Sequence, residues 1–440
     1  KLHISPYSFS IMNENIETIR KYNPWEGKML PAGMSRIYYT EKIEQYIGSR
    51  LVKVLVGQRR SGKSFILRQI MNSLLQKGIK GKNMLFISKE FIEYSFVEDF
   101  MTLEAIYQSY LEELKPEGKI YLFIDEVQNI KGWEKFVNSH SQDFTADVEI
   151  FISGSNSKML STELATLLSG RYVEFPIYPF RYEEYVAMNQ DSVGRQSYMK
   201  YLKDGGLPGM FELQSIESKV QYVSSVKDTI MLRDIIQRKQ NETNTASVRD
   251  AKLLDDIFVY LVSNASNPIS IQNIIKFFKG KQRKVAYETV SNYISYIVET
   301  FLTHPVRRYN IKGKSVSENP FKYYSNDLAF KNYLYPGIAY GIGYLLENAV
   351  FLELLKQGFS VYEGEGKDKE VDFVAIKGDR KIYVQCAYMI EDEDTKHREY
   401  ASLLEIKDSY EKWIVTLDEV QYPILEGIKH IQAWELSKYF

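Results

Sequence analysis

One stretch of this sequence, Gly57-Gln58-Arg59-Arg60-Ser61-Gly62-Lys63-Ser64, matches the pattern G-x-x-x-x-G-K-[ST]. A short apolar run, 52–56, precedes it, and an amphipathic helical pattern, 65–75, follows. Glycines at both ends let such a loop wrap closely around phosphate groups, and the backbone N–H groups and helix N-terminus stabilise their charge. We expect Lys63 to reach the outer phosphates and Ser64 to ligate Mg²⁺, and we count Phe65 with the loop as a nucleotide contact. A chance match is the alternative, and the strand–loop–helix context argues against it.

Three further short apolar runs follow, at 84–87, 120–124 and 148–152, with helical stretches at about 103–114 and 133–140 between them. Unbroken apolar runs that alternate with helices are typical of a parallel sheet covered on both faces. The sequence therefore predicts an α/β fold built around the loop.

Asp125 and Glu126 come directly after the run at 120–124. Ligands bind at the carboxyl ends of the strands in open α/β sheets, so these carboxylates are expected beside the phosphate loop. Asp125 is suited to hold Mg²⁺ through water, and Glu126 to orient and polarise an attacking water. Two carboxylates that merely cap a turn are the alternative. Together with the loop, they predict ATP and Mg²⁺ as cofactors and ATP hydrolysis as the reaction.

Two more side chains fit this chemistry. Asn156 follows the run at 148–152 and is placed to hold the water between Glu126 and the γ-phosphate. Arg171 precedes a predicted strand at 172–175, and it could neutralise charge on the transferring phosphoryl group in its own subunit or in a neighbour. A structural ion pair is the alternative for Arg171.

Composition restricts the other possibilities. The chain has 440 residues, which predicts two to three domains, and a net charge of -1, so any basic surface is local. The single cysteine, Cys386, excludes an intrachain disulfide and Cys-rich zinc sites. No apolar stretch is long enough to span a bilayer. We therefore expect a cytoplasmic protein without a membrane partner.

These motifs resemble the AAA+ superfamily of P-loop ATPases and, more narrowly, the bacterial and archaeal family that pairs an AAA domain with a C-terminal domain of unknown function, DUF4143. The matching stretches are 57–64, 123–128 with Trp133, 154–156, 168–171, 179–185, 205–208 and a helix at 228–238. The resemblance implies that Asn156 is the sensor-1 residue, that Arg171 is an arginine finger, and that the chain forms a homo-oligomer.

The middle of the chain predicts helices at 250–263, 270–278 and 286–300, then a hairpin formed by 306–310 and 322–324. This order resembles a winged helix-turn-helix. A basic cluster around it is expected to contact DNA phosphates, although a solvated surface is the plain alternative. Its members are Lys281, Arg283, Lys284, Arg307, Arg308, Lys312 and Lys314.

The end of the chain has the order of the PD-(D/E)xK nuclease fold: Glu347 on a helix, Asp372 on a strand, and a strand that ends at Gln385. The expected Glu-x-Lys is replaced here by Gln385-Cys386-Ala387. Loss of a carboxylate ligand and of the lysine charge argues against cleavage of phosphodiesters and predicts a DNA-binding or scaffold role instead. The alternative is that Gln385 supplies an oxygen ligand and the site keeps weak activity.

We therefore predict an N-terminal extension (1–50), a P-loop AAA+ core with a parallel sheet (51–178), a helical lid (179–248), a winged helix (249–335) and a small α/β nuclease-like domain (336–440). The expected function is ATP hydrolysis coupled to DNA binding, remodelling or movement. The alternatives are a nucleotide-dependent switch that acts on protein partners and an ATP-regulated nuclease.

Overall fold

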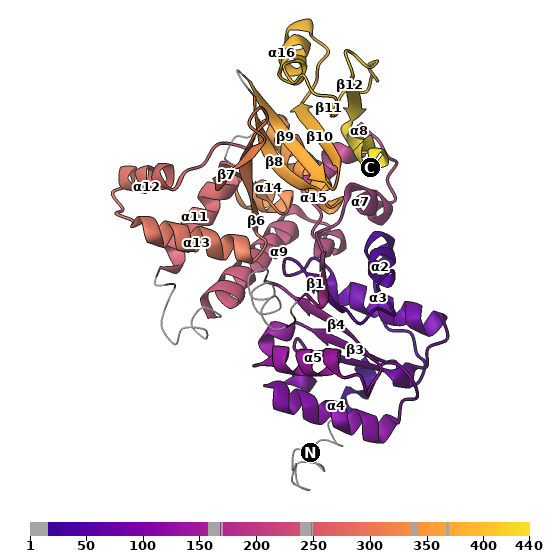
Figure 1. Ribbon diagram of the computed structural model, residues 1–440. Coiled ribbons are helices and arrows are strands. Elements are labelled where there is room, and N and C mark those ends of the chain that lie inside the picture. Colours follow the sequence, from indigo (N-terminus) through magenta and orange to yellow (C-terminus); the bar gives the residue numbers. More distant parts are fainter. Residues whose placement is uncertain are drawn as a thin grey trace. The chain divides into compact units, whose positions relative to one another are not determined.

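The computed structural model describes residues 16–156, 168, 170–237, 248, 250–336, 341–366 and 369–440. Ser169 and Arg238, which belong to stretches quoted above, lie outside these ranges, as do residues 1–15 of the predicted extension. The chain divides into two compact units, Lys1–Ile177 and Tyr178–Phe440, and Figure 1 shows the elements of each.

The first unit is built on a five-stranded sheet in the order β2-β3-β4-β1-β5. All four pairings in this sheet are parallel. The strands are β1 (Val52–Val56), β2 (Met84–Ser88), β3 (Ile120–Asp125), β4 (Val148–Gly154) and β5 (Tyr172–Pro176). The predicted α/β fold with a parallel sheet is thus confirmed.

Helices cover both faces of this sheet. They are α2 (Ile37–Glu44), α3 (Lys63–Gln76), α4 (Phe100–Leu114) and α5 (Trp133–Gln142), with short 3₁₀ turns at Arg20–Tyr22, Gly81–Asn83, Ile92–Tyr94 and Val127–Asn129. Ile66 and Ile70 of α3 pack in one apolar cluster with Leu55, Phe123 and Phe151 of the sheet. Figure 1 shows α4 and α5 on the other side. Because both faces are covered, every residue of β1 is buried.

The second unit begins with helices. They are α7 (Tyr182–Asn189), α8 (Arg195–Asp204), a 3₁₀ turn at Pro208–Glu212, α9 (Ile216–Thr229), which continues as a π-helical segment at Ile230–Gln237, α11 (Ala251–Ser263), α12 (Ile271–Gly280), α13 (Tyr287–Glu299) and α14 (Leu328–Leu334). Leu254, Phe258, Ile297 and Phe330 lie in the apolar core shared by α11, α13 and α14. The three predicted middle helices are therefore present.

A seven-stranded sheet in the order β12-β11-β10-β9-β8-β6-β7 completes this unit. Its strands are β6 (Thr303–Asn310), β7 (Ser315–Ser325), β8 (Ser360–Glu365), β9 (Glu370–Lys377), β10 (Arg380–Ala387), β11 (Glu411–Thr416) and β12 (Ile428–Gln432). The accompanying helices are α15 (Ile342–Lys356), α16 (Glu393–Leu404) and a 3₁₀ segment at Ala433–Tyr439.

The hairpin predicted as a wing, β6 and β7, is part of this sheet, because β6 pairs in parallel with β8 through Arg308, Tyr309 and Asn310. The sheet therefore crosses the predicted boundary between residues 335 and 336. Backbone hydrogen bonds thus join strands on either side of it, and both sides belong to one compact unit.

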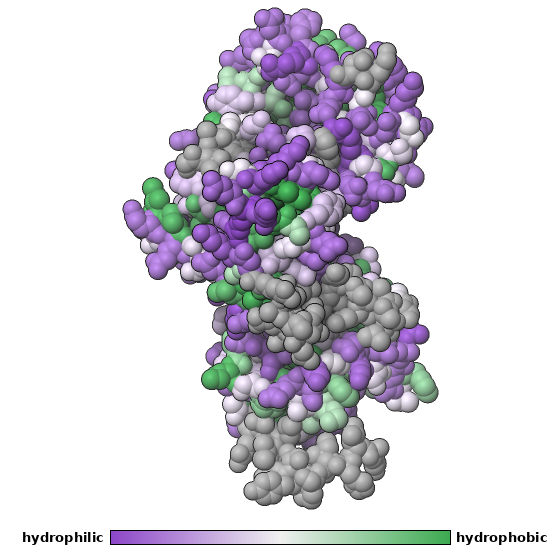
Figure 2. Space-filling model, turned by 90° about the vertical axis from the view of Figure 1, so that its left-hand side faces the viewer, coloured by the Kyte–Doolittle hydropathy of each residue, from purple (hydrophilic) through white to green (hydrophobic). Residues whose placement is uncertain are grey.

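The surface visible in Figure 2 is mostly hydrophilic, with exposed hydrophobic side chains interspersed. Within the described ranges, no helix combines the length and the apolar character that a bilayer crossing requires.

Candidate nucleotide-binding site

The loop from Gly57 to Gly62 joins the end of β1 to the first residue of α3, Lys63. A side chain at Gly57 would meet the carbonyl oxygen of Ile177 at 2.1 Å, and Gly62 has a φ of +100°. Both positions therefore require glycine, the first for space and the second for backbone conformation. Strand, loop and helix have the arrangement that the sequence pattern predicts.

Lys63 is buried, and its ammonium group lies inside the loop. Its Nζ donates hydrogen bonds to the carbonyl oxygens of Gly57 at 3.0 Å and Gln58 at 3.1 Å. The same nitrogen is 3.6 Å from Glu126 Oε1. The amine is thus held in the curve of the loop, where a phosphate group would find it.

Arg36, which no sequence motif identifies, stabilises the loop from the segment before β1. Its Nη1 donates to the carbonyl of Ser61 at 2.8 Å, and its guanidinium lies 4.5 Å from the centre of the Tyr39 ring. The backbone amide of Arg36 donates to Gln69 Oε1 at 3.0 Å, which fastens this segment to α3. Part of the predicted N-terminal extension therefore packs against the helix that follows the loop.

Asp125 is buried at the carboxyl end of β3, where three serines surround it. Ser88 Oγ donates to its Oδ2 at 3.1 Å, and Ser153 Oγ donates to its Oδ1. Burial raises the pKa of Asp125, as does the neighbouring Glu126 charge, while hydrogen bonds from Ser153 and Ser64 act in the opposite direction. A hydroxyl and a carboxylate from the two motifs thus lie side by side, a donor set that suits Mg²⁺.

Glu126 lies between two cations. Its Oε1 is 3.6 Å from Lys63 Nζ, and its Oε2 is 3.8 Å from Arg59 Nη2. Burial alone would raise its pKa, but attraction first to Lys63 and then to Arg59 outweighs burial and lowers the pKa. The carboxylate therefore stays ionised, as a base that orients water must be.

Further polar groups fix the position of Glu126. Gln128 Nε2 donates to Glu126 Oε2 and, at 3.1 Å, to Ser155 Oγ. The backbone amide of Glu126 donates to Ser153 Oγ at 3.1 Å, and its φ is +54°. Ser88, Ser153 and Gln128 were not predicted as site residues. Ser88 and Ser153 could have been found, because both are polar residues at the ends of buried strands, the same signal that identified Asp125.

Asn156 and Arg171 occupy different ends of the sheet. Asn156 is buried two residues after β4, on the side where β3 delivers its carboxylates. Arg171 precedes β5, whose Tyr172 and Pro176 pair with Val52 and Val56 of β1. Since the loop follows Val56, Arg171 lies roughly 16 Å away along the strands. Arg171 and the phosphate loop of one chain therefore lie at opposite ends of the paired strands.

The side chain of Arg171 is exposed, and no ion pair involving it occurs among the described residues. The structural ion pair considered for it is therefore not seen in that part of the chain.

In the second unit, Glu347, Asp372 and Gln385 line a single cavity of about 800 Å³. Gln385 Oε1 accepts from the Asp372 amide and from Ser402 Oγ, both at 3.3 Å, and its Nε2 donates to Glu399 at 3.0 Å. Both the amide oxygen and the amide nitrogen of Gln385 therefore have hydrogen-bond partners within the protein.

A lysine outside the predicted motif supplies a cation there. Lys322 Nζ is 3.4 Å from Glu347 Oε1 and 3.0 Å from Glu363. Burial, and then the Glu347 charge, raises the pKa of Asp372 well above its usual value. In the described ranges no three His, Cys, Asp or Glu side chains are arranged to hold a metal.

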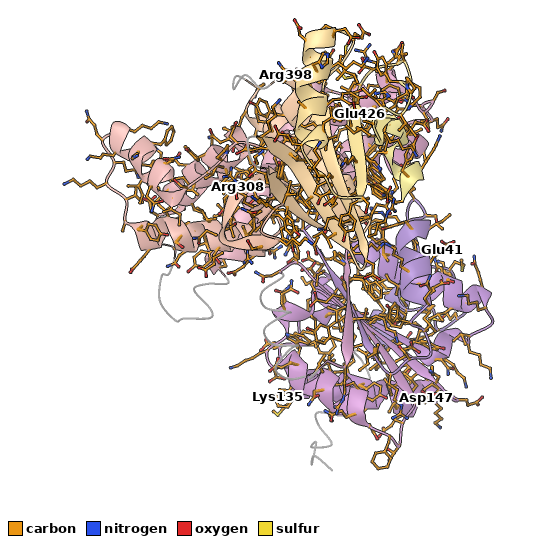
Figure 3. All side chains as sticks on the ribbon, turned by 45° about the horizontal axis from the view of Figure 1, so that its top comes forward. Glu41, Lys135, Asp147, Arg308, Arg398 and Glu426 are labelled. Atoms are coloured by element: carbon orange, nitrogen blue, oxygen red, sulfur yellow. The ribbon has the colours of Figure 1, made fainter. Side chains whose placement is uncertain are left out.

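The basic cluster is divided. Arg283 forms ion pairs with Asp250 and, at 2.7 Å, with Asp256. Arg308, labelled in Figure 3, pairs with Glu363 at 3.1 Å and with Glu370 at 2.6 Å. Both arginines are thus engaged by carboxylates of their own chain. The other five members are exposed: Lys281, Lys284, Arg307, Lys312 and Lys314.

Comparison with known proteins agrees with this geometry. Residues 49–186 match the family described as an AAA domain, and residues 195–339 match a domain of unknown function, DUF8612. The DUF4143 assignment and the nuclease-like domain implied by resemblance are not confirmed.

Among solved structures, the Walker-type ATPase of Pyrococcus abyssi is 14% identical and covers 70% of this chain and 99% of its own, with a TM-score of 0.42. AMPPCP-bound DnaA from Aquifex aeolicus is 14% identical and covers 64% and 92%, with a TM-score of 0.30. These scores are too low to establish one shared fold along the whole chain.

Two relatives are similar along most of their length. An uncharacterised protein of Methanocaldococcus jannaschii is 28% identical over 86% of this chain and 84% of its own. An uncharacterised protein of Haemophilus influenzae is 35% identical over 93% of this chain and its entire length. The chain therefore belongs to the same family as the Haemophilus influenzae protein, with an AAA domain in its first half.

Proposed function

We propose that the chain is a Mg²⁺-dependent ATPase. The observation that carries this proposal is the convergence of Lys63, Asp125 and Glu126 on one glycine-flanked loop, with Lys63 Nζ 3.6 Å from Glu126 Oε1. A cation for the phosphates, a carboxylate for a metal and an ionised base are the parts that phosphoryl transfer to water requires.

In this proposal the loop amides and Lys63 bind the β- and γ-phosphates, while Ser64 and Asp125 hold Mg²⁺. The metal, when bound, neutralises charge on the phosphate oxygens. Glu126 accepts the proton of the attacking water, and Asn156 orients that water. Gln128 and Ser153 keep the Glu126 carboxylate and backbone in place.

Arg171 acts on a neighbouring subunit in this proposal, which the register of β1 and β5 supports because it places Arg171 and the phosphate loop at opposite ends of the paired strands. The active form is therefore a homo-oligomer. Hydrolysis by a monomer is expected to be slow.

The test is an ATPase and nucleotide-binding assay on three proteins: the wild type, Lys63→Ala and Glu126→Gln. We expect the wild type to bind and hydrolyse ATP, and Lys63→Ala to do neither. Glu126→Gln should bind ATP with kcat reduced by about 10²–10⁴, the range for loss of a general base. Equal turnover in the wild type and Glu126→Gln would refute the proposed site.

We further propose that hydrolysis is coupled to DNA, which the five exposed basic residues support. Because carboxylates pair with Arg283 and Arg308, the positive charge that the basic cluster offers to DNA phosphates is smaller than the sequence predicts. This observation favours the switch acting on protein partners as the second candidate. If duplex or single-stranded DNA stimulates ATP turnover, and this stimulation disappears as the salt concentration is raised, the result supports coupling to DNA. ATP turnover that does not respond to DNA supports the switch that acts on protein partners.

A further inference from the structure

Gln69, a half-buried residue of α3, holds the segment that leads into α2. Its Nε2 donates hydrogen bonds to the carbonyl oxygens of Ala32 at 2.8 Å and Met34 at 2.6 Å. Its Oε1 accepts a hydrogen bond from the backbone amide of Arg36 at 3.0 Å, directly before α2 begins. Both ends of the side-chain amide thus bind the same short segment, and this fixes the position of Arg36 beside α3.

Arg36 in turn holds the phosphate loop. It is buried, with 2% of its surface exposed, and its Nη1 donates to the carbonyl oxygen of Ser61 at 2.8 Å. No cis peptide bond occurs among the described residues, so the peptide that joins Ser61 to Gly62 is trans. The C=O and N–H groups of a planar trans peptide point in opposite directions. Because the carbonyl is directed towards Arg36, the N–H of Gly62 is directed away from it.

The peptide between Ser61 and Gly62 needs such an anchor because glycine is conformationally permissive. Gly62 has a φ of +100°, and a residue without a Cβ changes its φ at little cost. Without the hydrogen bond from Arg36, this peptide would be free to turn over and present its carbonyl oxygen to a phosphate. The oxygen would repel the anion that the N–H attracts. The anchor therefore removes an unproductive conformation and reduces the entropy cost of binding.

We propose that Gln69 is a positioning residue for nucleotide binding: it sets Arg36 against the Ser61 carbonyl, and Arg36 keeps the N–H of Gly62 turned towards the phosphates. This inference rests on the proposed ATPase function. It assigns a part in phosphate recognition to a side chain that lies outside the loop and outside the acidic strand end, and that acts through another residue.

Asn72 provides a matched control on the same helix. It lies three residues after Gln69, and residues with this spacing are neighbours on a helix surface. The amide of Leu30 donates to Asn72 Oδ1, and the carbonyl oxygen of Leu30 accepts from Asn72 Nδ2, both at 2.8 Å. Asn72 thus holds the same segment without a hydrogen bond to Arg36. Loss of either side chain loosens the segment, but only loss of Gln69 releases Arg36.

Isothermal titration with ADP measures the effect without any hydrolysis. Gln69→Ala should raise the Kd for ADP about threefold to tenfold, the range expected for one hydrogen bond. Asn72→Ala should keep the Kd of the wild type. Urea unfolding should show losses of stability of similar size in both variants, since each removes hydrogen bonds between the segment and α3. A purely structural role of Gln69 would not separate stability from ADP affinity in this way.

A double-mutant cycle tests whether the effect passes through Arg36. In the Arg36→Ala background, Gln69→Ala should not raise the Kd for ADP further, because the guanidinium that Gln69 positions is gone. Any other contact of Arg36 is lost in both arms of the cycle and therefore cancels.

An isosteric pair of substitutions guards against a folding defect in Gln69→Ala. In Gln69→Glu an oxygen would face the carbonyl oxygens of Ala32 and Met34, so the Kd for ADP should again rise. Asn72→Asp introduces the same charge one helical turn away and should raise the Kd less.

The inference alone is overturned if the wild type binds ADP and Gln69→Ala binds it equally well. It is also overturned if Asn72→Ala weakens ADP binding as much as Gln69→Ala does, or if Gln69→Ala and Arg36→Ala act additively. A wild type with no affinity for ADP or ATP would overturn the proposed function and this inference together.

Discussion

The backbone carbonyl of Arg171 accepts a hydrogen bond from the amide of Val52 at 2.9 Å. Val52 begins β1, and the phosphate loop follows the other end of that strand. Arg171 therefore lies at the amino ends of the strands, and the phosphate loop of the same chain lies at their carboxyl ends. If Arg171 takes part in hydrolysis, its substrate is bound to another copy of the chain.

A mixing experiment tests this relationship. Arg171→Ala and Glu126→Gln should each have little ATPase activity alone, because the first lacks the arginine and the second lacks the base. A mixture should regain part of the activity, since an intact site of the first then meets an intact arginine of the second. A mixture of Arg171→Ala with Lys63→Ala should also regain part of the ATPase activity, because Lys63→Ala likewise keeps an intact arginine. Full activity of Arg171→Ala alone would remove the arginine from the mechanism.

Ser153 joins the two acidic residues, because its Oγ donates to Asp125 and accepts from the Glu126 amide. Ser153→Ala should lower the free energy of unfolding by about 1–3 kcal/mol, since it leaves buried partners of a hydroxyl unsatisfied. It should also raise the Mg²⁺ concentration needed for half-maximal turnover. Urea unfolding and a Mg²⁺ titration measure the two effects. Ser49→Ala, at an exposed turn, is the control that should change neither.

Asp327 is expected to make the stability of the second unit depend on pH. Burial raises the pKa of Asp327 to about 6 from 3.8, even though the amides of Gly206 and Ala329 donate to its carboxylate. Between pH 3.8 and about 6, the Asp327 carboxyl therefore holds a proton in the native state that it has lost in the unfolded chain. Its contribution is fully present below pH 3.8 and is lost as the pH rises through about 6, a change of about 3 kcal/mol.

Unfolding by urea at intervals from pH 4 to pH 7 measures this dependence. Asp327→Asn should be less stable throughout, because one amide would face an NH₂ group, and the difference between the two proteins should shrink as the pH rises. A difference that does not vary with pH would contradict the raised pKa.

Lys312 and Lys314 are exposed at the tip of the β6–β7 hairpin and carry the clearest test of DNA binding. Replacing both by Glu should weaken binding at low salt and reduce the slope of log K against log salt by about two, if each lysine contacts one phosphate. Fluorescence anisotropy with labelled duplex DNA measures it. Lys131→Glu with Lys135→Glu, in the other unit, is a control of equal charge change.

The first unit could be predicted from sequence because its strands are continuous apolar runs and its functional residues follow them directly. Val52–Val56 and Ile120–Asp125 are buried along almost their whole length, so burial on both faces is visible in the composition itself. The second sheet gave a weaker signal. β7 starts with an exposed stretch, 315–319, that is polar except for Val316, because one side of an edge strand has no neighbour.

Pairing between distant residues explains what the sequence did not reveal. In the sequence, Arg283 and Arg308 have the pattern of exposed surface charges, but in the structure they form ion pairs with Asp256 and Glu363. No spacing rule relates each arginine to its carboxylate partner. Arg59 and Glu90 are a third case. The position of Arg171 depends on the register between β1 and β5, which hydrophobic pattern alone does not specify.

The parallel pairing of β6 with β8 has a practical consequence for anyone who wishes to divide this protein. A truncation that stops after α14 would leave β6 without its pairing partner β8. A fragment that starts at α15 would expose β8 as an edge strand that can pair with strands of other molecules. Fragments separated there are therefore prone to aggregate. The helical middle region and the C-terminal strands therefore have to be produced as one polypeptide.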